Sequence, residues 1–153
     1  MGRRTIIVGL VLLAAGGCAP DMTALMLHVC LDPAVNDAVE NVRLVVDAGE
    51  LGEEAHVFAV PAGASEAQYS LRPGVELSDP LELELQVVGL TETGTERISR
   101  DVIASFEPDE DRDVWVSLEE GCLGVFCPDG ETCGETGSCR AVSTADESAC
   151  PEQ

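Results

Sequence analysis

Cysteine is the residue type in this sequence with the clearest capacity for chemistry. The chain has seven cysteines, and a thiol can pair with another in a disulfide or, as a thiolate, bind a metal ion. Structural zinc sites favour C-x2-C spacing, whereas the intervals after Cys122 are four, five, five and ten residues, with no histidine among them. Spacing therefore favours disulfides over zinc. The six cysteines expected to form them are Cys30, Cys122, Cys127, Cys133, Cys139 and Cys150.

Other side chains with chemical potential are sparse. His28 and His56 are each flanked by apolar residues, and neither stands in an H-E-x-x-H motif. No G-x-S-x-G motif marks a serine nucleophile. We expect both histidines to pack within strands or to face solvent. The sequence accordingly predicts no enzyme, no catalytic residue and no cofactor.

The acidic stretch from Asp109 to Asp113 is the best candidate for a ligand site. Carboxylate oxygens bind Ca²⁺, which makes Asp109, Asp111 and Asp113 candidate ligands. Arg112 interrupts the run, however, and the EF-hand pattern is absent. A solvent-exposed hairpin turn between the last two strands accounts for the same residues, so we expect no metal site here.

Charge narrows the class of partners. The formal net charge is −21, from 29 acidic and 8 basic residues. A nucleic-acid-binding protein neutralises phosphates with clustered Lys and Arg, so this composition argues against nucleic acid as a partner. The same charge disfavours adhesion to anionic lipid headgroups. A hydrophobic fraction of 45%, arranged in periodic runs, nevertheless favours a folded domain over a disordered acidic chain.

The first seventeen residues predict an export signal. Arg3 and Arg4 precede an uncharged, mostly apolar run from Thr5 to Gly17, which small residues close before Cys18. The run is shorter than the about 20 residues that a membrane-spanning helix needs. Export would bring the chain into an oxidising compartment, where disulfides form and persist.

The residues Leu13-Ala14-Ala15-Gly16-Gly17, followed by Cys18, resemble the lipobox of bacterial lipoproteins. In that family a peptidase cuts before the cysteine, which carries a diacylglycerol group, so the resemblance implies a lipid anchor at Cys18. Ala19 in the next position resembles an outer-membrane sorting signal. Setting Cys18 aside leaves six cysteines, an even number for pairing. A non-lipidated signal peptide cleaved near Gly17 is the alternative.

From Met22 to Glu119 apolar and polar residues alternate, with turn formers between the runs. Alternation with a period of two predicts strands that bury one face. Short helices compete only at Ala34–Val39 and Glu50–Ala55. The seven expected strands are Thr23–Leu31, Glu40–Asp47, Ala55–Val60, Ala67–Arg72, Leu81–Leu90, Glu96–Phe106 and Arg112–Leu118.

Seven short strands in one domain predict an all-β fold, namely a seven-stranded antiparallel sandwich. The segment Leu71-Arg72-Pro73-Gly74-Val75-Glu76-Leu77 resembles the L-x-P-G-x-x-Y corner of fibronectin type III domains, with Leu77 in the position of the tyrosine. A transthyretin-like sandwich fits the strand count equally well. The expected fold is therefore an immunoglobulin-like or a transthyretin-like sandwich, and the sequence does not choose between them.

From Gly121 onward the chain is rich in cysteine, glycine and turn formers. A segment of this size cannot bury a core, so crosslinks must hold it. Its spacing resembles EGF-like and dickkopf-like cysteine modules, and also the tails that follow β-sandwiches in exported lipoproteins. In an immunoglobulin-like sandwich the first and last strands run parallel, so Cys30 and Cys122 would lie at the same end. We expect a Cys30–Cys122 disulfide, with Cys30–Cys150 as the alternative.

Two aromatic residues stand near this tail. Trp115 falls on the opposite phase from Val114 and Val116, and Phe126 lies within the tail itself. We expect the tail to pack on the sandwich with these two rings in the contact. An outward-facing Trp115 that forms part of a binding surface is the alternative.

Together these patterns predict a membrane-anchored cell-envelope lipoprotein, located in the outer membrane and facing the periplasm or the cell surface. Its expected parts are a signal peptide (1–17), a lipidated N-terminus and linker (18–21), a β-sandwich domain (22–120) and a cysteine-rich tail (121–153). The expected function is a non-catalytic binding or structural one, with the membrane and an envelope protein as partners. An accessory subunit of an envelope complex is the alternative, followed by a carbohydrate-binding or calcium-binding domain. One Trp and one Tyr supply a sugar site poorly.

Overall fold

The computed structural model describes residues 23–145 and residue 150. Most of these residues form β-strands, so the expectation of a β-rich fold is confirmed. A strand lies at each of the seven ranges predicted from the alternation, with ends that differ by at most two residues. These strands are β1 (Leu25–Leu31), β2 (Asn41–Asp47), β3 (Glu53–Ala59), β4 (Glu66–Leu71), β5 (Leu81–Leu90), β6 (Glu96–Phe106) and β7 (Arg112–Leu118).

Short elements connect and follow these strands. Among the described residues, no helix is long and apolar enough to cross a membrane. The helical segments are α1 (Pro33–Asn36) and the 3₁₀ helices η1 (Gly49–Leu51) and η2 (Glu120–Cys122). The tail adds three short strands, β8 (Glu131–Cys133), β9 (Cys139–Ala141) and β10 (Ser143–Thr144).

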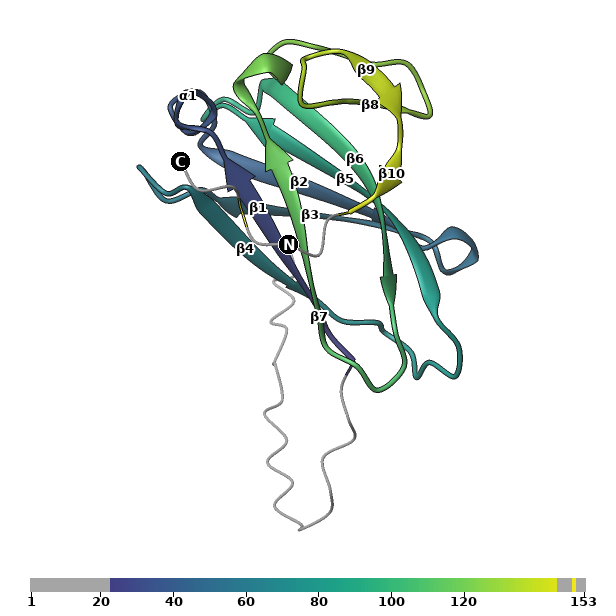
Figure 1. Ribbon diagram of the computed structural model, residues 1–153. Coiled ribbons are helices and arrows are strands. Elements are labelled where there is room, and N and C mark those ends of the chain that lie inside the picture. Colours follow the sequence, from purple (N-terminus) through teal and green to yellow (C-terminus); the bar gives the residue numbers. More distant parts are fainter. Residues whose placement is uncertain (1–22, 146–149, 151–153) are drawn as a thin grey trace, which may run out of the picture.

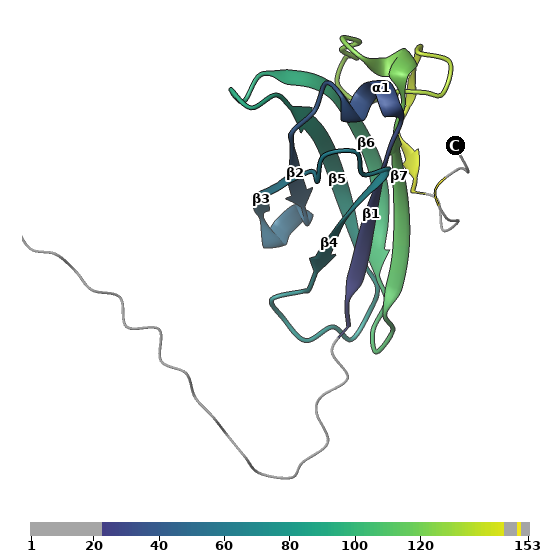
Figure 2. The same cartoon turned by 90° about the vertical axis from the view of Figure 1, so that its left-hand side faces the viewer.

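The strands form two main sheets that face each other, as Figure 1 and Figure 2 show from two sides. The smaller sheet has the order β4-β1-β7, the larger one has the order β10-β6-β5-β2-β3, and β8 pairs with β9 in a small third sheet. β1 and β7 pair in parallel, which was expected of the first and last strands. β10 also pairs in parallel with β6, which the sequence pattern did not indicate. The other pairs are antiparallel.

Alternation along each strand decides which face is buried. In β5, Leu83 and Leu85 are buried, whereas the alternating residues Glu82 and Glu84 are exposed. Successive side chains of a strand point to opposite faces, so the acidic residues gather on the outer faces of the sheets. Much of the net charge therefore lies in solvent, away from the core.

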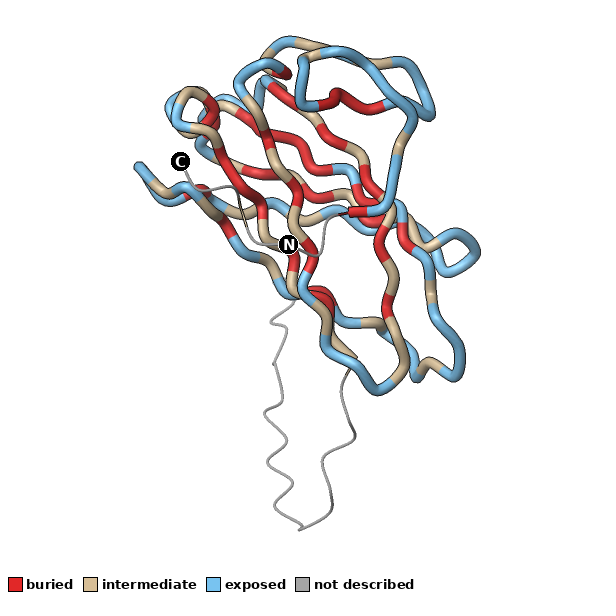
Figure 3. Tube along the Cα trace, in the orientation of Figure 1, coloured by how far each residue is buried: buried red, intermediate tan, exposed pale blue. Residues whose placement is uncertain are grey.

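The inner faces of the two main sheets share one aliphatic core, which appears as the buried stretches of facing strands in Figure 3. Both sheets contribute to it, and Val35 and Val39 close it beyond the end of β1. Removing such side chains from water is the main favourable term in folding. The largest fully buried side chains are Leu25, Leu27, Leu31, Leu44, Leu83, Leu85, Ile98 and Leu118.

The cysteine-rich tail packs along β6. The backbone N–H of Asp101 donates to Thr132 Oγ1 at 2.8 Å, and the N–H of Ala145 donates to the carbonyl of Ile103 at 2.7 Å. β10 pairs with the edge of β6 that β5 leaves free. The tail thus covers a row of backbone groups that would otherwise invite pairing with another chain.

Three connections lie at the end of the molecule where β1 begins, and we call this end the entry end. They are residues 48–52 between β2 and β3, residues 72–80 between β4 and β5, and residues 107–111 between β6 and β7. The register of the small sheet defines this end, because Leu25 pairs with Leu71 at the end of β4 and with Arg112 at the start of β7. The cysteine-rich tail lies at the opposite end (Figure 1).

We predict that Gly89→Ala destabilises the fold by about 1–3 kcal/mol, the usual cost of overpacking a core. A Cβ at this position in β5 would stand 2.6 Å from Ile98 Cγ2 and 2.7 Å from Val39 Cγ2. Both neighbours are β-branched and stiff, so neither can rotate away cheaply. Urea unfolding of the purified protein measures the loss.

The matched control is Gly74→Ala, because a Cβ there meets no atom within 4 Å. Equal unfolding midpoints for the two variants would contradict the packing described around Gly89.

Candidate functional site

Six cysteines form three disulfides, which confirms the expectation that the chain is crosslinked. The pairs are Cys30–Cys150, Cys122–Cys133 and Cys127–Cys139. The expected Cys30–Cys122 disulfide is therefore wrong, and the alternative, Cys30–Cys150, is present. The reason is direction: Cys122 turns into the core at the end of η2, whereas Cys30 lies on the outer face of β1, between the core residues Val29 and Leu31.

The expected signal peptide, the lipid on Cys18 and the linker up to residue 21 lie outside the described residues. The disulfides bear on Cys18 indirectly. Because the other six cysteines pair with one another, none remains in this chain as a partner for Cys18.

A histidine between two carboxylates is the most organised polar cluster on the outer face of the small sheet. His28, in the central strand β1, has Nδ1 at 2.5 Å from Glu66 Oε1 of β4 and Nε2 at 2.7 Å from Asp113 Oδ1 of β7. Its ring also stacks on Trp115, with centroids 4.6 Å apart. The cluster thus links all three strands of the sheet, and its side chains are neighbours because the strand register places them so.

These contacts favour the charged form of His28. Burial opposes protonation, but the hydrogen bonds and negative charges of Glu66 and Asp113 outweigh it and raise the pKa of His28 above 6.5. The physical reason is that an ionised carboxylate only accepts, so both ring nitrogens must donate to satisfy the two contacts. Hydrogen bonds from Gln68 and His28 in turn lower the pKa of Glu66 below 4.5.

The arrangement holds strands together and leaves His28 unsuited to act as a base. Both of its ring nitrogens are already engaged by carboxylates. The disulfide lies beside the cluster, since Cys150 Sγ is 3.7 Å from Glu66 Oε2. The sequence predicted that His28 would pack within a strand or face solvent, but it missed the ion pairs because Glu66 and Asp113 lie 38 and 85 residues away.

The two aromatic rings that the sequence placed near the tail have different surroundings. Trp115 lies half-buried against His28 on the small sheet, whereas Phe126 is 64% exposed. Phe126 follows Val125, whose side chain packs against the core, so the next side chain points the other way. The tail therefore contacts the core through smaller residues, namely Leu123, Val125 and the disulfides.

The acidic stretch 109–113 is divided between two places. Asp109 lies in the turn, where its N–H donates to Thr23 Oγ1 at 3.1 Å, while Asp113 belongs to β7 and bonds His28. Asp111 is exposed. In the described part of the chain, no three His, Cys, Asp or Glu side chains are grouped as metal ligands. The expected hairpin is also wrong, since β6 and β7 belong to different sheets and the turn crosses between them.

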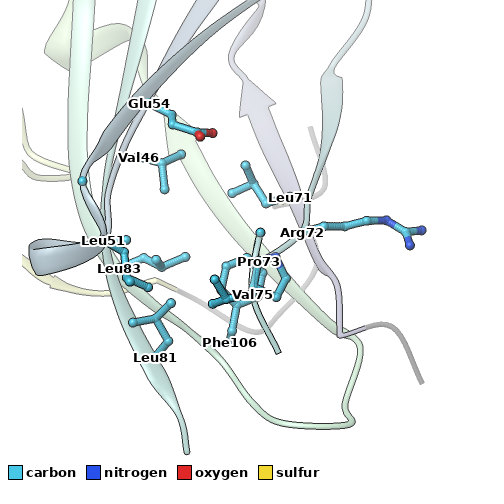
Figure 4. A pocket seen from close by; sticks show the side chains of 13 residues that line it. Val46, Leu51, Glu54, Leu71, Arg72, Pro73, Val75, Leu81, Leu83 and Phe106 are labelled. Carbon is cyan, nitrogen blue, oxygen red and sulfur yellow. The ribbon is translucent and has the colours of Figure 1, made fainter. Parts of the chain in front are cut away.

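An apolar pocket of about 200 Å³ opens at the entry end (Figure 4). It lies between η1 and the segment 72–75, which forms part of the β4–β5 connection. Leu51 and Val75 on its rim are 59% and 50% exposed, and Leu77, in the position that a tyrosine corner would give to tyrosine, packs half-buried against the core. The pocket is lined by Val46, Ala48, Leu51, Gly52, Glu54, Leu71, Arg72, Pro73, Gly74, Val75, Leu81, Leu83 and Phe106.

A second hollow, of about 460 Å³, is acidic. It crosses the outer face of the large sheet and carries Asp47, Glu53, Glu84 and Asp101, with Asp129 of the tail. Burial and the charges of nearby glutamates raise the pKa of Asp101 against an opposing hydrogen bond from Gln86. The hollow repels anions, in keeping with the charge of the chain.

Comparison of this chain with protein-family models, with curated proteins and with solved structures finds no match to any of them. The functional argument therefore rests on the residues and geometry described above.

We predict that Trp115 emission reports the protonation of His28. The single Trp of the chain stacks on this ring, so a positively charged imidazole should change its emission. The titration midpoint should lie above pH 6.5, the ordinary pKa of histidine. His28→Gln should abolish it, whereas His56→Gln, which alters a ring that lies tilted against Tyr69, should leave it intact.

The same pKa shifts predict how the cluster stabilises the fold as pH changes. Because the pKa of His28 is raised in the folded protein, His28 contributes to the free energy of unfolding. This contribution is complete below pH 6.5 and is lost as pH rises through the pKa of the folded state. The lowered pKa of Glu66 also gives a contribution to the free energy of unfolding. That contribution is complete above pH 4.5 and is lost as pH falls through the pKa of the folded state. The difference in unfolding free energy between wild type and His28→Gln should therefore be largest between these values. A difference that grows above pH 6.5 would contradict this sign.

We predict that the Cys30–Cys150 disulfide stabilises the fold more than Cys127–Cys139. It joins residues 120 apart in sequence, against 12 for the other pair. The loop-entropy relation gives about 5 kcal/mol for the long loop and about 3 kcal/mol for the short one. Urea unfolding of the paired Cys→Ala variants measures both losses, and a larger loss for Cys127→Ala with Cys139→Ala would reverse the ranking.

Proposed function

We propose that this chain is an exported lipoprotein of the cell envelope, held in a membrane by a lipid on Cys18 and acting as a non-catalytic binding or structural module. The observation that carries the proposal is the pairing of the cysteines. Three disulfides use the six cysteines other than Cys18, and disulfides persist in exported, oxidising compartments. Cys18 is left over, at the position where the sequence resembles a lipobox.

Strand order supports a transthyretin-like sandwich as the fold type, with the cysteine-rich tail added to it. In immunoglobulin domains the first strand shares a sheet with the second, fourth and fifth. Here β1 lies between β4 and β7, while β2 lies in the opposite sheet between β3 and β5. Of the two sandwich types that the sequence left open, this order departs from the immunoglobulin one.

A binding or structural role fits the side chains better than catalysis or sugar binding. His28 has both nitrogens engaged, and Trp115 and Tyr69 each have a ring face already covered by another ring. The surfaces left for contact are the apolar pocket, the exposed Phe126 and the acidic outer face. We place the protein in the outer membrane, facing the periplasm or the cell surface, with an envelope protein as a further partner.

We predict that the mature protein begins at Cys18 and carries the mass of a diacylglycerol group there. Two or more acyl chains anchor a protein stably, so the wild type should enter the detergent phase on phase separation. Cys18→Ala should remove both the lipid mass and the cut before residue 18. Intact-mass spectrometry of the two proteins expressed in a bacterial host measures the difference.

Gly2→Ala, a change far from the cut, serves as the control and should be lipidated as wild type. A mature N-terminus with an unmodified Cys18 would contradict the proposal. So would a diacylglycerol mass that Cys18→Ala retains.

A further inference from the structure

Two exposed apolar residues lie together at the entry end. The described part of the chain has four exposed large hydrophobic residues, Leu51, Val57, Val75 and Phe126. Two of them, Leu51 and Val75, form the rim of the apolar pocket on η1 and the β4–β5 connection (Figure 4). Exposed apolar side chains around a hollow mark an interaction surface more often than isolated ones do.

The proposed anchor reaches the molecule at this same end. Thr23 precedes β1, and Leu25 pairs directly with Leu71, which lines the pocket. Cys18 stands five residues before Thr23, and a segment of this length spans at most about 18 Å when fully extended. A lipid on Cys18 therefore holds the entry end close to the bilayer surface and raises its effective concentration there.

Charge around the pocket selects the kind of lipid surface. Glu50, Glu54 and Glu76 near the rim are exposed, with Arg72 beside them. Carboxylates are repelled by anionic headgroups, whereas a zwitterionic surface imposes no such penalty. The apolar contact is small, so it needs the tether to keep it at the surface.

We propose that the entry end docks on the bilayer that holds the anchor, with Leu51, Val75 and the pocket between them facing zwitterionic lipid. This inference rests on the proposed lipidation of Cys18. Docking fixes the orientation of the whole molecule, because the tail end then points away from the membrane (Figure 1). Phe126, which belongs to the tail, is 64% exposed. The tail would thus be the part offered to a partner in the envelope.

The test places a fluorescent reporter at each exposed apolar position. In the full lipidated chain with Trp115→Phe, a single Trp is introduced as Leu51→Trp or Val75→Trp. The matched controls are Val57→Trp and Phe126→Trp, since these positions are 63% and 64% exposed and lie away from the pocket. Each protein is reconstituted into phosphatidylcholine vesicles with or without bromine-labelled acyl chains, which quench Trp emission on contact.

Docking predicts that bromine-labelled lipid lowers the emission of Leu51→Trp and Val75→Trp by roughly twofold, as for a side chain at the headgroup–acyl boundary. The two control variants should keep their emission. Replacing part of the phosphatidylcholine by phosphatidylglycerol should weaken the quenching at the pocket, because of the carboxylates near it.

Equal quenching at all four positions, or at none, would overturn the docking. A blue-shifted Leu51→Trp emission that is the same without vesicles would also overturn it, since protein and not lipid would then cover this side chain. These outcomes are separate from failure of the anchor. Protein that does not float with the vesicles and lacks the lipid mass at Cys18 would refute the proposed function itself.

Discussion

The two facing sheets share one core of leucine, valine and isoleucine side chains. The placing of the polar clusters, the tail and the pocket depends on this contact. Aromatic residues make up only 3% of the chain, so the core is filled by aliphatic side chains that suit a pleated surface. Because the inner residues of each strand must be apolar, the residues between them lie on the outer faces. The acidic side chains of β5 are exposed in this way, and His28 lies on the outer face of the small sheet, covered by its neighbours.

The outer face of the small sheet shows how polar contacts build on that arrangement. His28 of the central strand is bonded to one carboxylate on each neighbouring strand. A surface ion pair alone adds little stability, but here the ring is largely covered and both of its nitrogens are satisfied. Stacking of Trp115 on the same ring excludes water from one side. The cluster therefore ties the three strands together.

The cysteine-rich tail is attached to both main sheets, by strand pairing to one and by a disulfide to the other. Its strand β10 adds to the edge of β6 in the large sheet, and Cys150 is bonded to Cys30 in the small sheet. The other two disulfides close short loops within the tail. They are needed because a segment so small buries too little surface to fold unaided. The result is a molecule with two unlike ends, an apolar pocket at one and crosslinked loops with an exposed Phe126 at the other.

The sequence by itself determined where the strands lie, because alternation with a period of two is a local property of the chain. It also indicated that six cysteines pair, from their even number and from the smallness of the tail. Tertiary structure alone decided their partners, since Cys122 turns inward at η2 while Cys30 faces outward. It decided the His28 cluster and the pocket as well, because strand register and sheet order bring together residues that are far apart in sequence, and alternation along one strand carries no information about its neighbours.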